Sequence, residues 1–167
     1  MKLKELLKNV EDVELTKEQE KQIKDFLGIK NSKKWMPKKS EKYFYINCCG
    51  DIDYCVNSDD EADMYCFLTN NYFKTKEEAE FRLEQIKVYY ELKNFADDNN
   101  DEICWIHQSQ LKYYMLYSYV ENELDITSWT NVRDLGQIYF SSEELAKQAV
   151  EKVGEDRIKK YLFEVWE

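Results

Sequence analysis

Proline and glycine are scarce in this chain: its 167 residues include one proline and four glycines. Long flexible linkers need Gly, Ser or Pro in quantity, so the composition excludes them. Four isolated glycines also cannot form a Gly-rich phosphate-binding loop, and no serine stands in a nucleophile-elbow context. Histidine occurs once, as His107, so a Cys–His site would need it beside Cys104 or Cys66. A single histidine among scattered cysteines favours the interpretation that His107 has no catalytic role. We therefore expect no enzymatic activity and no catalytic residue.

Long apolar runs are missing as well. No window approaches the roughly 18 apolar residues of a membrane span, and the N-terminus has no apolar core of a signal peptide. The five cysteines are odd in number and fit neither a disulfide framework nor a zinc-binding spacing. We therefore expect a cytoplasmic protein with reduced thiols, without contact to membrane, and with no metal or cofactor.

Charge is the most uneven property of the chain. The net charge is −10, yet residues 1–42 hold 12 lysines against 8 acidic residues. The remaining residues are strongly acidic, which disfavours direct binding of nucleic acid. Solubility alone explains an acidic surface; the functional interpretation is a partner with a basic surface, either a protein or a nucleoprotein complex.

Two stretches of the sequence recur. Trp35, Lys42, Tyr43 and Phe44 return 70 residues later as Trp105, Lys112, Tyr113 and Tyr114, and the run 72–79 returns 67 residues later as 139–146. Such self-similarity indicates a tandem duplication. We predict an α+β fold with an N-terminal helical hairpin over 1–30 and βββα repeats over 31–100 and 101–167. The two repeats are expected to form one domain with a single antiparallel sheet and the helices packed on it.

Periodicity and turn residues place the elements. Strands are predicted over 43–46, 52–56 and 64–68 in the first repeat, and over 113–120, 124–130 and 137–140 in the second. Thr75 with Glu78, and Ser141 with Glu144, have capping-box spacing and predict the starts of two long helices. Gly154 is expected to end the second of these, and a terminal helix follows it.

Acidic turns beside tyrosines are the first candidate site. Few basic residues interrupt the predicted strand segments, so the fold could collect their acidic turns on one edge. Such an edge could occupy a basic nucleic-acid channel of another protein, although ordinary solvated turns explain the pattern equally simply. EF-hand loops are rejected because the central Gly and the terminal Glu are missing. The candidate partner-binding residues are Asp59, Asp60, Glu61, Asp63, Tyr65, Tyr117, Tyr119, Glu121 and Glu123.

A lysine-rich stretch around a tryptophan is the alternative site. Lysines that flank an aromatic ring can hold phosphate and stack a base. The stretch can equally be a solvated connector in which the tryptophan anchors the first strand. On this alternative, a nucleic-acid- or nucleotide-binding accessory protein would use the Tyr-rich sheet face together with Lys33, Lys34, Trp35 and Lys38.

Three parts of the sequence carry a family resemblance: residues 71–81 followed by 88–93, residues 135–146 running to 154–162, and the segment Trp35-Met36-Pro37. Over residues 33–165 the chain resembles small acidic proteins of phages, prophages and mobile elements of low-GC Gram-positive bacteria. The resemblance transfers no catalytic or binding residue. It implies, by analogy with other small phage proteins, a non-enzymatic inhibitor of host defence of the anti-CRISPR kind.

Overall fold

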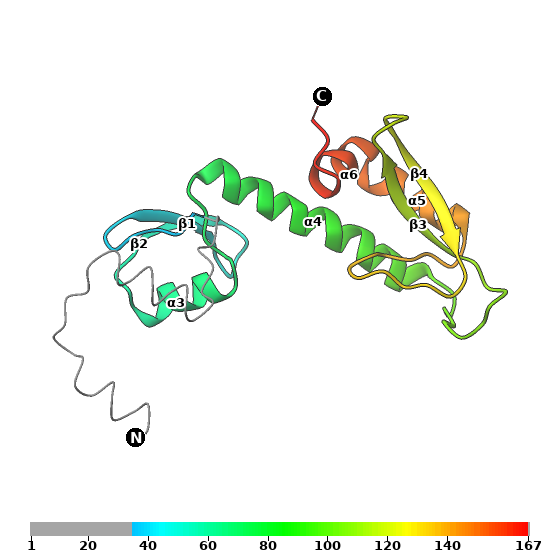
Figure 1. Cartoon of the computed structure of the whole chain (residues 1–167), viewed down its shortest axis with the longest axis horizontal. Coiled ribbons are helices and arrows are strands. Elements are labelled where there is room, and N and C mark those ends of the chain that lie inside the picture. Colours follow the sequence, from blue (N-terminus) through cyan, green and yellow to red (C-terminus); the bar gives the residue numbers. More distant parts are fainter. Residues whose placement is uncertain (1–34, 167) are drawn as a thin grey trace, which may run out of the picture. The chain divides into compact units, whose positions relative to one another are not determined.

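The computed structural model describes residues 35–166, and the chain from Pro37 onward forms one compact unit (Figure 1). The fold is α+β, as predicted. The predicted helical hairpin over 1–30 lies outside the described residues. The elements are β1 (Lys42–Ile46), β2 (Ile52–Val56), α3 (Glu61–Leu68), α4 (Lys76–Asn99), β3 (Lys112–Ser118), β4 (Glu123–Trp129), α5 (Glu143–Val153) and α6 (Glu155–Leu162).

The prediction of a single sheet is wrong. Among the described residues, β1 pairs only with β2 and β3 only with β4, in two separate antiparallel sheets. The outer edge of the first strand in each hairpin, β1 or β3, forms a bridge with a single residue. Phe44 exchanges backbone hydrogen bonds with Phe73 at 2.9 Å, and Tyr113 exchanges them with Phe140 at 2.9 and 2.8 Å. The predicted third strand over 137–140 is thus reduced to a single bridge. The free edges of β1 and β3 are each bonded by a residue from later in the same predicted repeat.

The predicted strand over 64–68 is a helix, α3, because its start is firmly capped. The Asp60 carboxylate accepts from the backbone N–H of Asp63, and the Asp63 side chain accepts from the backbone N–H of Asp60. This reciprocal arrangement satisfies two donors that a helix start leaves unpaired. The spacing of two aspartates three residues apart was the available signal, and the short apolar run that follows outweighed it in the strand prediction.

Matching ladder positions relate the two hairpins at an offset of 69 residues, not 70. Phe44 and Tyr113 make equivalent bonds to Phe73 and Phe140. Tyr43 and Lys112 therefore hold the same position, and both are buried. Because a one-residue slip moves a side chain to the other face of a strand, the sequence match of Lys42 with Lys112 does not hold in space. The duplication itself stays a prediction.

The main apolar core lies where α4 packs on α5 and α6 beneath β3 and β4. Ser142 is the N-cap of α5, one residue later than the predicted Ser141. Its Oγ accepts from the backbone N–H of Leu145 at 3.2 Å. Gly154, at a φ of 97°, ends α5 as predicted and leads into α6. The buried side chains of this core are Val88, Leu92, Phe95, Ala96, Met115, Ile138, Phe140, Ala146, Ala149, Val153 and Ile158.

A forked ion pair joins α6 to α4. The Arg157 guanidinium donates to both carboxylate oxygens of Glu91, at 2.8 and 3.0 Å, and these bonds hold the pKa of Glu91 below its usual value. Both side chains are about two-fifths exposed, at 39% and 44%. Solvent therefore screens the pair, and its net contribution stays near that of a surface pair.

We expect Arg157→Met to lower the free energy of unfolding by about 0.5–1 kcal/mol, because the pair is bidentate but half solvated. Urea denaturation at low and high salt measures the loss, which should shrink as salt screens the pair. Arg82→Met, on the exposed face of α4, is the matched control and should change stability little. A loss that is independent of salt would assign the effect to the packing of the arginine stem.

Candidate partner-binding surface

The outer face of the β3–β4 hairpin carries the clearest surface feature. Residues that face each other across an antiparallel pair point to the same side. Tyr113, Met115, Leu124 and Ile126 pack on the core, so the opposite face presents Leu116 with Asp125 and Ser118 with Glu123. The alternation places two carboxylates, two positions apart on β4, on the solvent side of this sheet.

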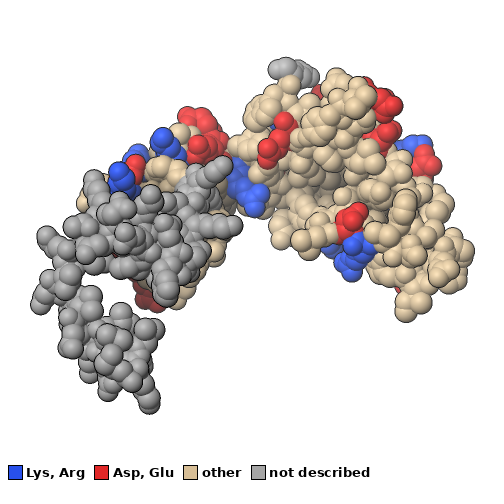
Figure 2. All heavy atoms as spheres, viewed as in Figure 1, with Lys and Arg blue, Asp and Glu red and all other residues tan. Residues whose placement is uncertain are grey.

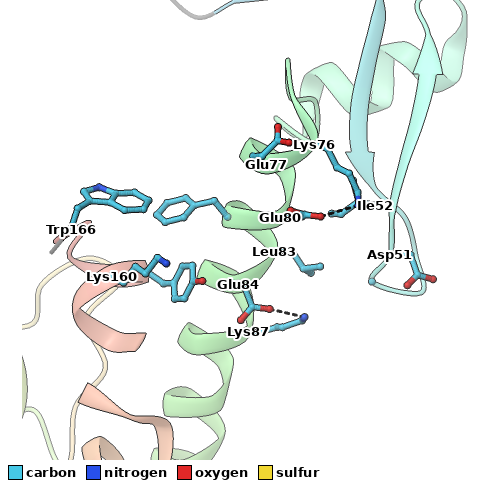
Figure 3. Close-up of a pocket in the computed structure, with 13 residues that line it drawn as sticks. Asp51, Ile52, Lys76, Glu77, Glu80, Leu83, Glu84, Lys87, Lys160 and Trp166 are labelled. Carbon is cyan, nitrogen blue, oxygen red and sulfur yellow. Dashed lines mark hydrogen bonds and ion pairs between the residues drawn. The ribbon is translucent and has the colours of Figure 1, made fainter. Parts of the chain in front are cut away.

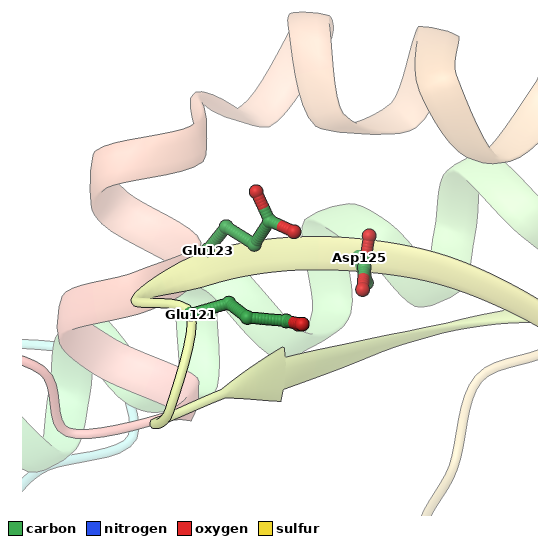
Figure 4. A group of neighbouring side chains, drawn as sticks. All are labelled: Glu121, Glu123 and Asp125. Carbon is green, nitrogen blue, oxygen red and sulfur yellow. The ribbon is translucent and has the colours of Figure 1, made fainter.

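Glu121, in the turn, completes a row of carboxylates with Glu123 and Asp125 (Figure 4). One ligand oxygen of each residue lies within 4.8 Å of the others, and all three residues are exposed. We call these three residues the acidic row. Within residues 35–166, no ion pair neutralises any of them. The row is thus a concentration of negative charge without an ion-pair partner in the described chain.

Local contacts fix the turn that presents the row. Asn122 adopts a φ of 58°, a left-handed conformation that asparagine tolerates. Its Oδ1 accepts from the Tyr117 hydroxyl, and the backbone N–H of Glu121 donates to the Ser118 Oγ at 3.2 Å. The hydroxyl of Tyr119 donates to the carbonyl of Phe163 at 2.7 Å. These bonds hold the turn against the C-terminal segment.

The first acidic group, which consists of Asp59, Asp60, Glu61 and Asp63, has a mainly structural role. Asp63 must be removed from the predicted partner contacts. Asp63 is only 1% exposed. Its carboxylate accepts from the Tyr43 hydroxyl at 2.7 Å and from the Ser58 backbone N–H at 2.8 Å. Burial alone would raise the pKa of Asp63, but these hydrogen bonds outweigh it and hold the pKa below its ordinary value. A buried and fully bonded carboxylate cannot meet a partner.

The neighbours of Asp63 remain on the surface. Asp60 caps α3, and its pKa is lowered by the backbone N–H of Asp63 and the hydroxyl of Ser58. Asp59 lies 3.6 Å from the ammonium of Lys39. Glu61 accepts from the hydroxyl of Tyr65, which is 61% exposed. Each of these carboxylates already has a local role, unlike those of the acidic row.

The two acidic groups lie on different elements and do not form one surface. The first group lies at the N-terminal end of α3, while the acidic row belongs to the β3–β4 hairpin, which packs on α5 (Figure 1). On the face shown in Figure 2, acidic and basic side chains are interspersed and do not gather in one field. The expectation of one acidic edge is therefore not met.

The predicted tyrosines divide in the same way. Tyr117 is buried, at 9% exposure, and packs against Tyr119 and Phe163, so it supports the hairpin and offers no partner contact. Tyr119 is exposed beside Val120 at the tip of the hairpin. Asp125, on β4 with Glu123, belongs to the acidic row and was absent from the predicted set. Its alternation with Glu123 along β4 is the signal that could have identified it.

The alternative lysine–tryptophan site is only partly described. Lys33 and Lys34 lie outside the described residues. Trp35 is half-buried, and Lys38 is exposed, with its backbone N–H bonded to the Glu41 carboxylate at 2.8 Å.

A groove of about 850 Å³, which was not predicted from the sequence, runs along α4 (Figure 3). Trp166 stacks on Phe81 with ring centroids 5.1 Å apart, and Lys160 lies over the Trp166 ring. Two of the three lysines that line the groove are paired with glutamates, Lys76 with Glu80 at 3.0 Å and Lys87 with Glu84 at 2.7 Å. Four acidic residues line the groove against these three lysines, so it lacks the net positive charge that a phosphate-bearing ligand would need.

The Cys–His alternative finds no supporting geometry. The His107 ring lies 3.2 Å from the Ser109 Oγ. Within the described part of the chain, no hydrogen bond joins His107 to the thiol of Cys104 or Cys66. Burial raises the pKa of the Cys66 thiol, which lowers its fraction of thiolate, the nucleophilic form.

Comparisons with known proteins add no family: no family model, no curated protein and no solved structure matches this chain. Among the described residues, no helix combines the length and the apolar character needed to cross a membrane.

Proposed function

We propose that this protein is a non-enzymatic protein–protein interaction module whose acidic row binds a basic surface of a bacterial protein or nucleoprotein complex. The supporting observation is the exposed cluster of Glu121, Glu123 and Asp125, which has no ion-pair partner among the described residues. Two like charges about 4 Å apart repel by about 1 kcal/mol even in bulk water. A cationic partner relieves this repulsion, so the row favours basic over neutral partners.

The partner class follows from the sequence resemblance and from analogy. Small acidic proteins of phages include inhibitors that compete with nucleic acid for a basic channel. We infer an anti-CRISPR-like role in which the row occupies the nucleic-acid path of a bacterial defence nuclease. The interaction would be steered by charge, and raised salt would weaken it.

A capture experiment from bacterial lysate tests the proposal. The wild-type chain, in buffer with EDTA so that no metal bridges the carboxylates, should retain a nuclease-type effector. We expect the triple variant E121K/E123K/D125K to bind the recovered partner about tenfold or more weakly, about 1.4 kcal/mol or more. Surface plasmon resonance over a range of salt concentrations measures the affinity.

A second triple variant provides the control. D98K/D101K/E102K changes the net charge equally at exposed positions away from the hairpin, so it should retain most of the affinity. Equal losses from the two variants would replace the acidic row with a general charge effect. Binding that is insensitive to salt would contradict the proposed mechanism.

The nucleic-acid alternative makes the opposite prediction. A base stacked on an exposed tryptophan quenches its fluorescence, and binding of phosphate strengthens at low salt. We expect no quenching when an oligonucleotide is added to the full chain at low salt. Saturable quenching lost on K38E would support the alternative and weaken the proposed role.

A further inference from the structure

The outer edge of β4 is an unpaired strand edge. Tyr113 directs its backbone N–H and C=O to Phe140, so its pair with Ser128 is a non-hydrogen-bonded pair of the β3–β4 ladder. The pattern alternates along the strands. The backbone N–H and C=O groups of Leu124, Ile126 and Ser128 therefore point away from β3, and within residues 35–166 none of them has a hydrogen-bond partner.

The side chains at this edge are incompletely covered as well. Leu124 and Ile126 contact the core cluster yet remain half-buried, and Trp129, at the end of β4, is 52% exposed. An open edge of this length is a template for another strand. Addition of a strand would satisfy the free backbone groups and continue the cover over the half-exposed apolar side chains.

We propose that the free edge of β4 is a self-association surface, on which β4 of a second copy pairs antiparallel about a two-fold axis through Ile126. In this register Leu124 faces Ser128 of the second copy, and Ile126 faces its own equivalent. These are the positions whose backbone groups point outward, and each such pair exchanges two N–H···O bonds. A two-fold pairing uses the same surface on both copies, as closed dimers do.

The charges of β4 fit this register. Asp125 comes to lie opposite Thr127 of the second copy, and Glu123 opposite Trp129, so no carboxylate directly faces a carboxylate. A shift of the centre by one position keeps the same backbone groups facing the partner, but it shortens the overlap of the two seven-residue strands to five residues. Centred on Asp125, the register also places Asp125 against itself. Like charges directly opposite each other destabilise a strand pair. The register centred on Ile126 thus gives the longest overlap of the two strands and sets no carboxylate opposite another.

The acidic row keeps its place on the outer face of the resulting four-stranded sheet. Each chain carries a net charge of −10, so two copies repel at long range. Salt screens this repulsion, and self-association is expected to strengthen as salt is raised. Binding to a basic partner should weaken under the same conditions. The two interactions are thus distinguishable, and this inference does not depend on the proposed function.

Sedimentation equilibrium of the full chain tests the proposal, with a reversible dimer expected. Position 127 provides a matched pair of variants, since it faces Asp125 of the second copy twice in each dimer. T127E should weaken the dimer and T127K should strengthen it, each by about 2- to 30-fold in Kd, as expected for two cross-strand charge pairs. The double variant D125K/T127E restores opposite charges across the axis and should restore the dimer.

Ser128→Pro tests the backbone contribution. Its N–H points outward, so proline removes a donor of the new interface but no bond of the β3–β4 ladder. We expect about a tenfold or larger increase in the dimer Kd, with the thermal transition of the monomer retained. A wild-type chain that stays monomeric at every concentration and salt level would overturn the proposal. So would a dimer whose Kd is unchanged by T127E and Ser128→Pro, or an edge occupied only by a strand of another protein.

Discussion

Replacing Asp63 with alanine is expected to lower the free energy of unfolding by about 3 kcal/mol. The carboxylate is 1% exposed and accepts from the Tyr43 hydroxyl, which is also buried, and from the backbone N–H of Ser58. Its removal leaves buried donors without an acceptor, which costs about 1–3 kcal/mol for each group. It also breaks the reciprocal cap of α3, worth about 1 kcal/mol. Urea denaturation followed by circular dichroism measures the loss.

Two further variants locate the cause. Tyr43→Phe removes only the hydroxyl and should cost about 1–2 kcal/mol, since the carboxylate keeps its backbone donors. Because the two residues are bonded to each other, the double variant should lose less than the sum of the single losses. Glu61→Ala, in the same helical turn but exposed, is the control and should change stability by less than about 0.5 kcal/mol. An additive double variant would contradict the assigned bond.

The pH dependence of stability follows from the same pair. The pKa of Asp63 is lowered in the folded state from its ordinary value of 3.8, so its stabilisation is fully present above that value. It is lost as pH falls through the lower, folded-state pKa. Burial and the bond to Asp63 raise the pKa of Tyr43 above 10.0, so the tyrosine stabilises the fold below pH 10.0 and that stability falls at higher pH. In Asp63→Asn the acid-side loss should flatten, as chemical denaturation at a series of pH values would show.

Features determined by neighbouring residues in the sequence were predicted more accurately than the pairing of strands. Thr75 was correctly identified as the start of α4, where its hydroxyl oxygen accepts from the Glu78 N–H, and Gly154 as the end of α5. These features are decided within one helical turn. The sheet arrangement was wrong because the edges of β1 and β3 are closed by Phe73 and Phe140, and strand partners distant in sequence leave no local pattern.

The candidate site shows the same division. Alternation along β4 could have placed Asp125 beside Glu123, since that depends on neighbours in sequence. The burial of Asp63 depends on Tyr43, 20 residues earlier, and on the cap of α3. Turn composition alone marks an aspartate as a surface residue, and only the fold assigns this one to the interior.

Lys112→Ala is expected to lower the free energy of unfolding by about 2–4 kcal/mol, because it removes a fully buried stem and leaves two carbonyls without their donor. Lys112 occupies the position of Tyr43 in the other hairpin and is 0% exposed. Its ammonium donates to the carbonyls of His107 at 3.1 Å and Thr130 at 2.5 Å and lies 5.7 Å from the centre of the Trp105 ring. The lysine thereby ties the loops on both sides of the hairpin to the start of β3.

The comparison with Lys112→Met separates the stem from the charge. Methionine retains most of the apolar volume and removes the cost of burying an ammonium, so its loss should be less than half that of Lys112→Ala in urea denaturation. Lys38→Ala, an exposed lysine, is the control and should change stability by less than about 0.5 kcal/mol. Equal losses from the two Lys112 variants would assign the stabilisation to the hydrogen bonds of the ammonium. An undiminished stability in Lys112→Ala would contradict the role of this lysine in tying the loops to β3.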